Sequence, residues 1–229
     1  MKTKVNRIAL LPLIGLLLAA PAARAADLSV APLYKAPPVV ATPAYNWSGF
    51  YLGANAGGGW STSHWDSTGS FNGSGGVAGG TVGLNWQTGH AVFGIEGDID
   101  WANVKGTTTP ATCLAGCTTQ NDWLATARGR AGYAFDRFLP FVTGGLAVGD
   151  IKASTPGFPG ASQTNAGWTV GGGLEFALTN NWTAKAEYLH VDLGNMNCGF
   201  NCGVTPGNNV SLREDVVRGG VNVKFGGGN

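Results

Sequence analysis

The chain has 229 residues, and its charge is nearly balanced, with 14 Lys and Arg against 13 Asp and Glu. Charged residues make up only 12% of it, about half of the roughly 25% that is usual in soluble domains. A net charge of +1 argues against a basic nucleic-acid-binding surface, so we expect no nucleic acid partner. The 38 glycines lack the three-residue period of collagen, and in a small β-barrel they would let the strands curve.

The N-terminal region reads as a secretory signal peptide over residues 1–25. A basic start, an apolar run over residues 8–20 and a small-x-small cleavage site at residues 23–25 follow one another. Residues 26–46 are rich in proline and predict an extended segment, and residues 47–229 form the predicted folded domain. No later segment has eighteen uninterrupted apolar residues, so a mature chain that crosses a membrane must do so with strands.

Eight strands are predicted in the folded domain, joined by connections that alternate between long and short. The strands cover residues 50–60, 75–86, 91–101, 123–133, 139–149, 168–178, 182–193 and 210–225. The long loops cover residues 61–74, 102–121, 150–166 and 194–209. This alternation is typical of a transmembrane barrel with long external loops and short periplasmic turns, and an even strand count lets the sheet close without an unpaired edge.

The third and fourth predicted strands carry opposite charges. Side chains of a strand alternate between two faces, and over residues 91–101 one face is apolar and the other acidic. Residues 123–133 alternate between small apolar side chains and a face that carries Arg. If the tryptophans that end the two strands mark the same rim of a hairpin, Glu96 and Arg128 lie at the same height. The acid and the base then meet on the face that is turned away from the apolar side.

Two architectures would place these strands differently. In a soluble sandwich the apolar face is the core and the charges are solvated, whereas in a transmembrane barrel the apolar face meets lipid and the charges fill the lumen. Taken alone, the two strands slightly favour the sandwich. The signal peptide, the low charge and the alternating loop lengths favour an all-β, eight-stranded antiparallel transmembrane barrel.

The tryptophans at strand ends fall into two groups, one beside the long loops and one beside the short turns. Trp60, Trp101, Trp123 and Trp168 end strands beside long loops, while Trp47, Trp86 and Trp182 lie at the opposite ends, as does Phe225. Trp65 belongs to neither group. Amphipathic aromatic side chains favour the two membrane interfaces, so the sequence predicts two aromatic girdles.

The same alternation predicts an ion-pair network in the lumen. Five acids and five bases point inward: Glu96, Asp98, Asp100, Glu175 and Glu187, with Arg128, Arg130, Lys185, Arg218 and Lys224. Because an eight-stranded barrel is just wide enough for side chains to fill and unpaired buried charges are costly, we expect a plugged lumen. In the seventh strand the alternation turns His190 and Asp192 outward, so either the strand has risen above the hydrocarbon there or a bulge changes its phase.

Several stretches resemble a known family, the alphaproteobacterial porin-family small outer-membrane proteins of rhizobia and Brucella. The matching stretches are ADL after the cleavage site, YKAPP, WSGFYLGANAG, VFGIEGDID, ARGRAGYAFD, LPFVTGG and KAEYLHVDLG. The resemblance implies an eight-stranded barrel in the Gram-negative outer membrane, a role in envelope integrity or surface exposure, and no catalytic residues. Such barrels usually end on an aromatic residue that the assembly machinery reads, whereas here GGGN follows Phe225.

The four cysteines form two CxxxC pairs, Cys113 with Cys117 and Cys198 with Cys202, both in predicted external loops. Disulfides persist in exported proteins, and we favour closure within each pair, although a bond between the two loops stays open. A metal site of all four thiolates is the alternative, but zinc sites prefer CxxC spacing and reducing conditions. No metal site is therefore predicted.

The expected function is that of a structural outer-membrane protein without a cofactor. Its expected partners are outer-membrane lipid and lipopolysaccharide, and the barrel assembly machinery during insertion, and we expect a monomer. A narrow small-solute porin and a loop-mediated adhesin or ligand-binding protein are the alternatives. A lipid-modifying enzyme could place His64 and Asp66 at the outer rim, but polar loops commonly contain such residues.

Overall fold

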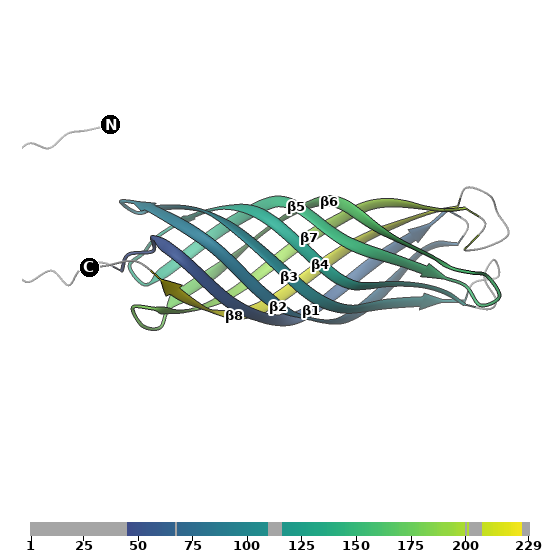
Figure 1. Ribbon diagram of the computed structural model, residues 1–229, viewed down its shortest axis with the longest axis horizontal. Coiled ribbons are helices and arrows are strands. Elements are labelled where there is room, and N and C mark those ends of the chain that lie inside the picture. Colours follow the sequence, from purple (N-terminus) through teal and green to yellow (C-terminus); the bar gives the residue numbers. More distant parts are fainter. Residues whose placement is uncertain (1–44, 67, 110–115, 200, 202–207, 226–229) are drawn as a thin grey trace, which may run out of the picture. The chain divides into compact units, whose positions relative to one another are not determined.

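The structure is a computed structural model that describes residues 45–66, 68–109, 116–199, 201 and 208–225. It forms a closed barrel in which eight antiparallel strands follow one another in chain order (Figure 1). The strands are β1 (Gly49–Trp65), β2 (Gly69–Thr88), β3 (Ala91–Thr108), β4 (Cys117–Tyr133), β5 (Phe138–Ser154), β6 (Ala161–Ala177), β7 (Trp182–Gly199) and β8 (Asn208–Phe225). The predicted fold class is confirmed. No helix in the described part of the chain has the length and apolar character needed to cross a membrane.

The strands are longer than the sequence pattern predicted. Each has 17 to 20 residues, about twice the roughly 9–11 that cross a bilayer. The predicted loops over residues 61–74, 102–121, 150–166 and 194–209 are therefore wrong in extent, because the strands continue through much of them. Their outward side chains are mostly polar, so the composition of these stretches is that of a loop although the backbone remains paired.

The hairpin of β3 and β4 has the predicted register. Trp101 pairs with Trp123, and Glu96 pairs with Arg128. The register of the two strands shifts between Trp101 and Val104. The regular pairing that aligns the acids of β3 with the arginines of β4 therefore ends at the two tryptophans.

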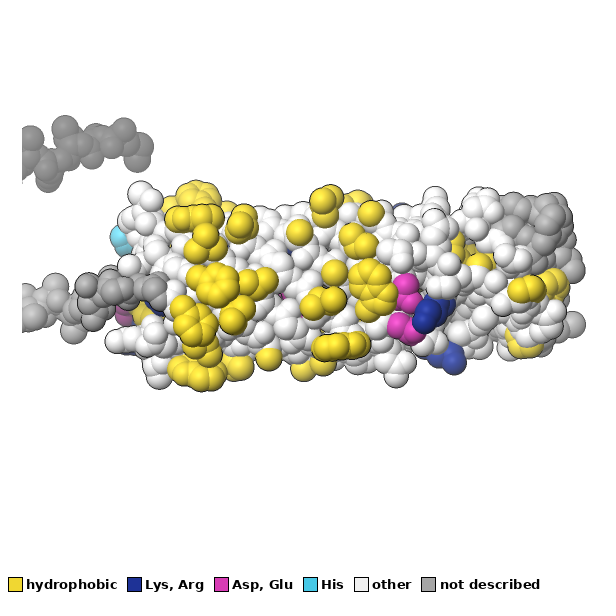
Figure 2. All heavy atoms as spheres, in the orientation of Figure 1, with side chains coloured by type: hydrophobic (Ala, Val, Ile, Leu, Met, Phe, Trp, Pro, Cys, Tyr) yellow, Lys and Arg dark blue, Asp and Glu magenta, His cyan; other side chains and the backbone are white. Residues whose placement is uncertain are grey.

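The outward face carries two bands of hydrophobic side chains separated by smaller residues (Figure 2). On β3 the exposed large hydrophobic side chains begin at Phe93 and end at Trp101. The predicted girdle members that are exposed are Trp60, Trp86, Trp101, Trp168, Trp182 and Phe225, and Trp123 is half-buried. Trp60, Trp101 and Trp168 are exposed and lie toward the strand ends that have the longer connections, and we call them the outer belt.

Trp47 is not part of a girdle, which corrects the prediction. Its side chain is 1% exposed and lies edge-on to the ring of Tyr45, with 4.8 Å between centroids. The indole Nε1 donates to the carbonyl of Asp136 at 2.9 Å. Since Trp47 precedes β1, no strand alternation fixes its direction, and it turns into the barrel mouth.

The seventh strand keeps its phase through His190 and Asp192. The first register shift of β7 comes after Asp192, and Asp192 pairs with Trp168 of the outer belt. No bulge changes the phase of β7 before Asp192. The other explanation therefore holds, and this part of the strand lies at the outer end of the hydrocarbon.

Beyond the outer belt the polarity of the two faces is reversed. The interior there is an apolar cluster that includes Trp65, Phe71, Val104, Ile151 and Leu212. The exposed side chains of the same stretch include Thr62, Asn72, Lys105 and Arg213, and hydrophobic side chains are fewer on this surface than in the two bands (Figure 2). We call this part of the barrel the extension. The reversal follows from the surroundings, because a wall that meets water must place its apolar side chains inside.

Candidate functional site: the charged lumen

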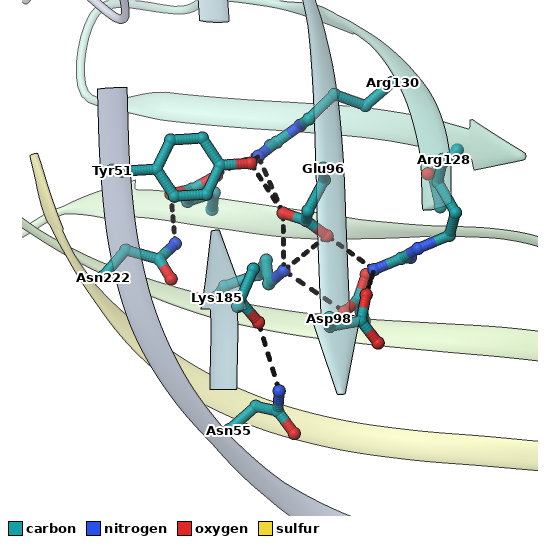
Figure 3. A network of polar contacts seen from close by, with 12 residues as sticks. Tyr51, Asn55, Glu96, Asp98, Arg128, Arg130, Lys185 and Asn222 are labelled. Carbon is teal, nitrogen blue, oxygen red and sulfur yellow. Dashed lines mark hydrogen bonds and ion pairs between the residues drawn. The ribbon is translucent and has the colours of Figure 1, made fainter. Parts of the chain in front are cut away.

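Arg128 is the centre of the lumen network. Its Nη2 donates to Glu96 Oε1 at 2.6 Å and to Asp98 Oδ2 at 2.7 Å. Its Nη1 donates to Glu187 Oε2 at 3.0 Å. All four side chains are buried, and they come from β3, β4 and β7, so the network ties together strands on different sides of the barrel (Figure 3).

A second arginine extends the network toward the outer belt. The Nε of Arg218 donates to Glu187 Oε1 at 2.8 Å, and its Nη1 donates to Asp98 Oδ1 at 2.8 Å. The same guanidinium also contacts Asp100. Arg218 therefore joins β8 to the acidic face of β3.

The network continues toward the periplasmic end through Arg130. Its Nη2 donates to Glu175 Oε2 at 2.7 Å, and its Nη1 donates to the hydroxyl of Tyr51 at 3.1 Å. The Tyr51 hydroxyl donates in turn to Glu96 at 2.7 Å, and the ammonium of Lys185 donates to the same carboxylate at 2.9 Å (Figure 3).

Nine of the ten predicted lumen residues meet in this network, and Lys224 does not. Lys224 is buried, but its ammonium lies 4.3 Å from the ring centroid of Tyr45 and contacts the carbonyl of Asn46. Within the described residues it forms no ion pair. All ten residues are buried, as the alternation predicted, but the ion-pair network itself contains five acids and four bases.

Neutral side chains that the sequence analysis did not single out complete the hydrogen bonding. Thr126 donates to Asp98 at 2.7 Å, and Thr183 and Asn222 donate to Glu175 at 2.6 and 2.9 Å. Their positions follow the same two-residue alternation as the charges, so a search of the inward face for hydroxyl and amide groups would have found them.

Glu214 of β8 was missed as well. It has the same parity as Arg218 and is fully buried, but neither carboxylate oxygen has a hydrogen-bond partner in the described part of the chain. It lies where the network gives way to the apolar cluster, since Val104 and Glu214 both approach Gly59. Alternation alone would have predicted that it points inward, but not that it lacks a partner.

The inner faces of β1 and β2 are lined with glycine because the charged side chains lie against them. A Cβ at Gly79 would stand 2.1 Å from Asp100 Oδ1, and one at Gly83 would stand 2.2 Å from Tyr51 Cζ. Larger residues at these positions would overlap the network. The high glycine content therefore makes room for long polar side chains in a narrow barrel.

The residues before β1 fill the periplasmic mouth. Tyr45 and Trp47 pack with Val92, Leu139 and other residues in a second apolar cluster, and the Tyr45 N–H donates to Asp136 Oδ1 at 2.8 Å. Residues 45 and 46 were predicted to belong to the extended segment, but they pack on the barrel. The remainder of that segment and the predicted signal peptide lie outside the described residues.

The comparisons identify the family. Residues 11–225 match the family described as outer membrane protein beta-barrel domain. This chain belongs to that outer-membrane β-barrel family. It is located in the outer membrane of Gram-negative bacteria, as the sequence analysis predicted, and the short turns between β2 and β3, β4 and β5, and β6 and β7 mark the periplasmic end of a barrel of this kind.

The named relatives are outer-membrane proteins of Brucella and Rhizobium. The chain is 36% identical to the 31 kDa outer-membrane immunogenic protein of Brucella melitensis over 90% of this chain and 95% of the relative. It is 32% identical to the 25 kDa outer-membrane immunogenic protein of Brucella canis over 82% and 84% of the two chains. The 22 kDa outer membrane protein of Rhizobium leguminosarum bv. viciae is 33% identical, with 80% of each chain covered. The resemblance drawn from the motifs is confirmed.

Two of the four cysteines of this outer-membrane barrel lie in the described part of the extension. Cys117 and Cys198 are both disulfide-bonded and buried in the apolar cluster of the extension. Cys113 and Cys202 lie outside the described residues, so closure within each pair stays a prediction.

The charged side chains of the lumen pair with one another. No group of three or more His, Cys, Asp and Glu in the described ranges could hold a metal ion. His64 contacts the Ser70 hydroxyl at 3.0 Å, whereas Asp66 accepts from the Asn209 side chain at 3.0 Å. The two residues considered for a lipid-modifying site thus have separate partners.

Proposed function

We propose that the protein is a closed structural barrel that contributes to the integrity of the outer membrane and conducts no solute. The supporting observation is that three layers of side chains fill the interior one after another. They are the periplasmic cluster around Trp47, the ion-pair network around Arg128 and the apolar cluster around Trp65. The proposal assigns no catalytic role to the barrel.

The energetics of the middle layer support a plug. A permeating ion would have to displace buried carboxylates from Arg128, which holds three of them. Breaking a buried ion pair commonly costs about 3–5 kcal/mol, because the remaining charge is left unpaired in a medium of low dielectric constant. A solute would then still have to pass the apolar cluster of the extension.

Single-channel recording in planar bilayers tests the closed state. The purified barrel, inserted from detergent, should show no discrete conductance steps, and insertion is verified by protease protection of the same preparation. Reproducible ohmic steps from the wild-type protein would support the narrow porin in its place.

Complementation tests the contribution to the envelope. Removal of the chain should increase the sensitivity of the bacterium to detergent and the leakage of a periplasmic enzyme, and the wild-type gene should reverse both. An unchanged envelope in the deletion strain would contradict the proposal.

Loop-mediated binding is the second candidate. It is favoured by the extension, in which the strands continue beyond the outer belt. The connections between these strand ends are residues 66–68, 109–116, 155–160 and 200–207. Replacing these connections by short Gly-Ser turns tests it. We expect that such a barrel still restores the envelope, whereas an adhesin would lose attachment to its ligand while remaining folded.

A further inference from the structure

The extension has a polar outward surface of considerable height. Beyond the outer belt, β1 continues over residues 61–65 and β3 over residues 102–108, which is about 16–23 Å along the strand at roughly 3.3 Å per residue. Figure 2 shows acidic and basic side chains beside a band of hydrophobic side chains. Because aromatic belts mark the membrane interface, a surface directly beyond the outer belt faces the headgroups of the outer leaflet.

A hollow lies at the base of the extension, where β3, β4, β5 and β6 meet the outer belt. It has a volume of about 550 Å³ and is lined by Trp101, Trp123, Asp122, Lys152 and Thr164, among others. Trp101 is 75% exposed, the largest exposed fraction among the large hydrophobic side chains of the described part. An adjoining hollow of about 450 Å³ shares Lys152 and Ser162 with the first and adds Gln120.

Asp150 fixes the position of Asp122 and Lys152 in the hollow. Asp150 is mostly buried, and its Oδ1 accepts from the backbone N–H groups of Asp122 and Trp123 at 2.8 and 3.2 Å. The Lys152 ammonium contacts the Asp122 carboxylate and lies 3.5 Å from Asp150 Oδ2. Lys152 and Asp122 form an ion pair, and the hydrogen bond from Lys152 lowers the pKa of the Asp122 carboxyl.

The charge balance of the hollow indicates the kind of ligand. Three carboxylates and one ammonium line the hollow. Asp100 pairs with Arg218 in the lumen, and the remaining Asp122 and Asp150 outnumber Lys152. The net negative charge disfavours a phosphate. Carboxylates accept hydrogen bonds from hydroxyls, and an ammonium donates to them. An exposed indole beside such groups offers an apolar face with a polar edge. Charged acceptors, a charged donor, hydroxyls and an indole together suit a sugar ring, which has hydroxyls at its rim and C–H groups on its faces.

We propose that this hollow binds an unphosphorylated sugar ring in the headgroup of an outer-leaflet glycolipid, with Trp101 against the face of the ring and Asp122 and Lys152 on its hydroxyls. The inference does not depend on whether the lumen conducts, so the bilayer recordings and the binding experiment can fail separately. It commits to a lipid headgroup because the hollow opens directly above the belt that meets the lipid.

Titration calorimetry of the full barrel in phospholipid nanodiscs tests the proposal. The probe is the deacylated core oligosaccharide of lipopolysaccharide, used with its phosphates and after their chemical removal. Both forms should bind the wild type with similar Kd. Asp122→Asn and Lys152→Gln should each weaken binding at least tenfold, because hydrogen bonds to charged groups are the strong ones. Ser162→Trp, which fills the space shared by the two hollows, should abolish binding.

Arg213→Gln is the matched control. Arg213 also lies beyond the outer belt and is also exposed, and its Nε donates to Asp192 at 3.0 Å, but it lines neither hollow. The Arg213→Gln variant should bind both forms of the oligosaccharide with the same Kd as the wild type. All variants must keep the heat-modifiable gel mobility of the folded barrel.

Native mass spectrometry of protein extracted from its own membrane tests the lipid source. Wild type and Arg213→Gln should retain glycolipid, and Asp122→Asn and Lys152→Gln should lose it. Loss of oligosaccharide binding after removal of the phosphates would overturn the proposal in favour of a phosphate site at Lys152. Equal weakening by Arg213→Gln, or no binding to the wild type, would also overturn it.

Discussion

Arg128 concentrates three ion pairs in one buried side chain, and this makes it the most sensitive single position of the network. Arg128→Ala leaves Glu96, Asp98 and Glu187 with fewer buried cations, so we expect a loss of about 3–5 kcal/mol in the free energy of unfolding. Urea unfolding in lipid vesicles, followed by heat-modifiable mobility, measures it. The exposed Arg213→Ala should cost less than about 1 kcal/mol. Equal stability of Arg128→Ala and the wild type would mean that the lumen is solvated.

Glu214 is the opposite case, because its burial is not compensated by any hydrogen bond among the described residues. Replacing an unpartnered buried carboxyl by an apolar residue of similar size removes a desolvation cost. Glu214→Leu should therefore raise the free energy of unfolding by about 1–3 kcal/mol in the same assay. A decrease of more than about 1 kcal/mol would show that the carboxyl has a stabilising partner.

Two neighbouring glycines of β2 lie on opposite faces of the barrel wall, one toward the packed interior and one toward the outside. Gly79 faces the interior, where an added Cβ would stand 2.1 Å from Asp100 Oδ1, whereas one at the neighbouring Gly80 would meet nothing closer than 3.8 Å. Gly79→Ala should destabilise the barrel by about 1–3 kcal/mol through overpacking. Gly80→Ala is the matched control and should be nearly neutral. Similar unfolding midpoints for the two variants would contradict the tight contact between β2 and β3.

Strand phase was predictable from the sequence, but strand length was not. The alternation of apolar and acidic residues in β3 is strong enough to fix which side chains face inward, and the pairing of Glu96 with Arg128 follows from it. In the extension the same period of two continues with the polarity reversed, and the inward Trp65, Phe71 and Val104 are separated by polar residues that suggest a loop. When a strand passes from lipid into water, its two faces exchange polarity but its overall composition changes little, so composition does not show where the strand ends.

The contacts of Trp47 and Lys224 could not be predicted from the sequence either. Both lie at the periplasmic mouth, where Tyr45 and Asn46 bring further partners. These contacts join the segment before β1 to the end of β8, so no local pattern encodes them. Most of the lumen site was predictable for the opposite reason, since every member of the network lies on a regular strand.

At the scale of the whole molecule, the outward apolar bands predict where charge is tolerated. Ile95 is 58% exposed and lies between the two bands, so Ile95→Arg should cost about 2–4 kcal/mol, as expected for a cation near the bilayer midplane. Thr62→Arg, on the outward face of the extension, should cost less than about 1 kcal/mol. Urea titration of the two variants in vesicles compares them. Equal costs would mean that lipid does not surround β3 at Ile95.

The reversal of polarity at the outer belt has a consequence for how the protein sits in the bilayer. If the barrel sank by two residues, hydroxyls and ion pairs of the extension would enter hydrocarbon, and if it rose by two, Phe93 and its neighbours would enter water. Both displacements are unfavourable, so the barrel wall itself sets the depth of immersion. Its outermost connections are thereby presented at a constant height above the lipid, whatever molecules approach from outside.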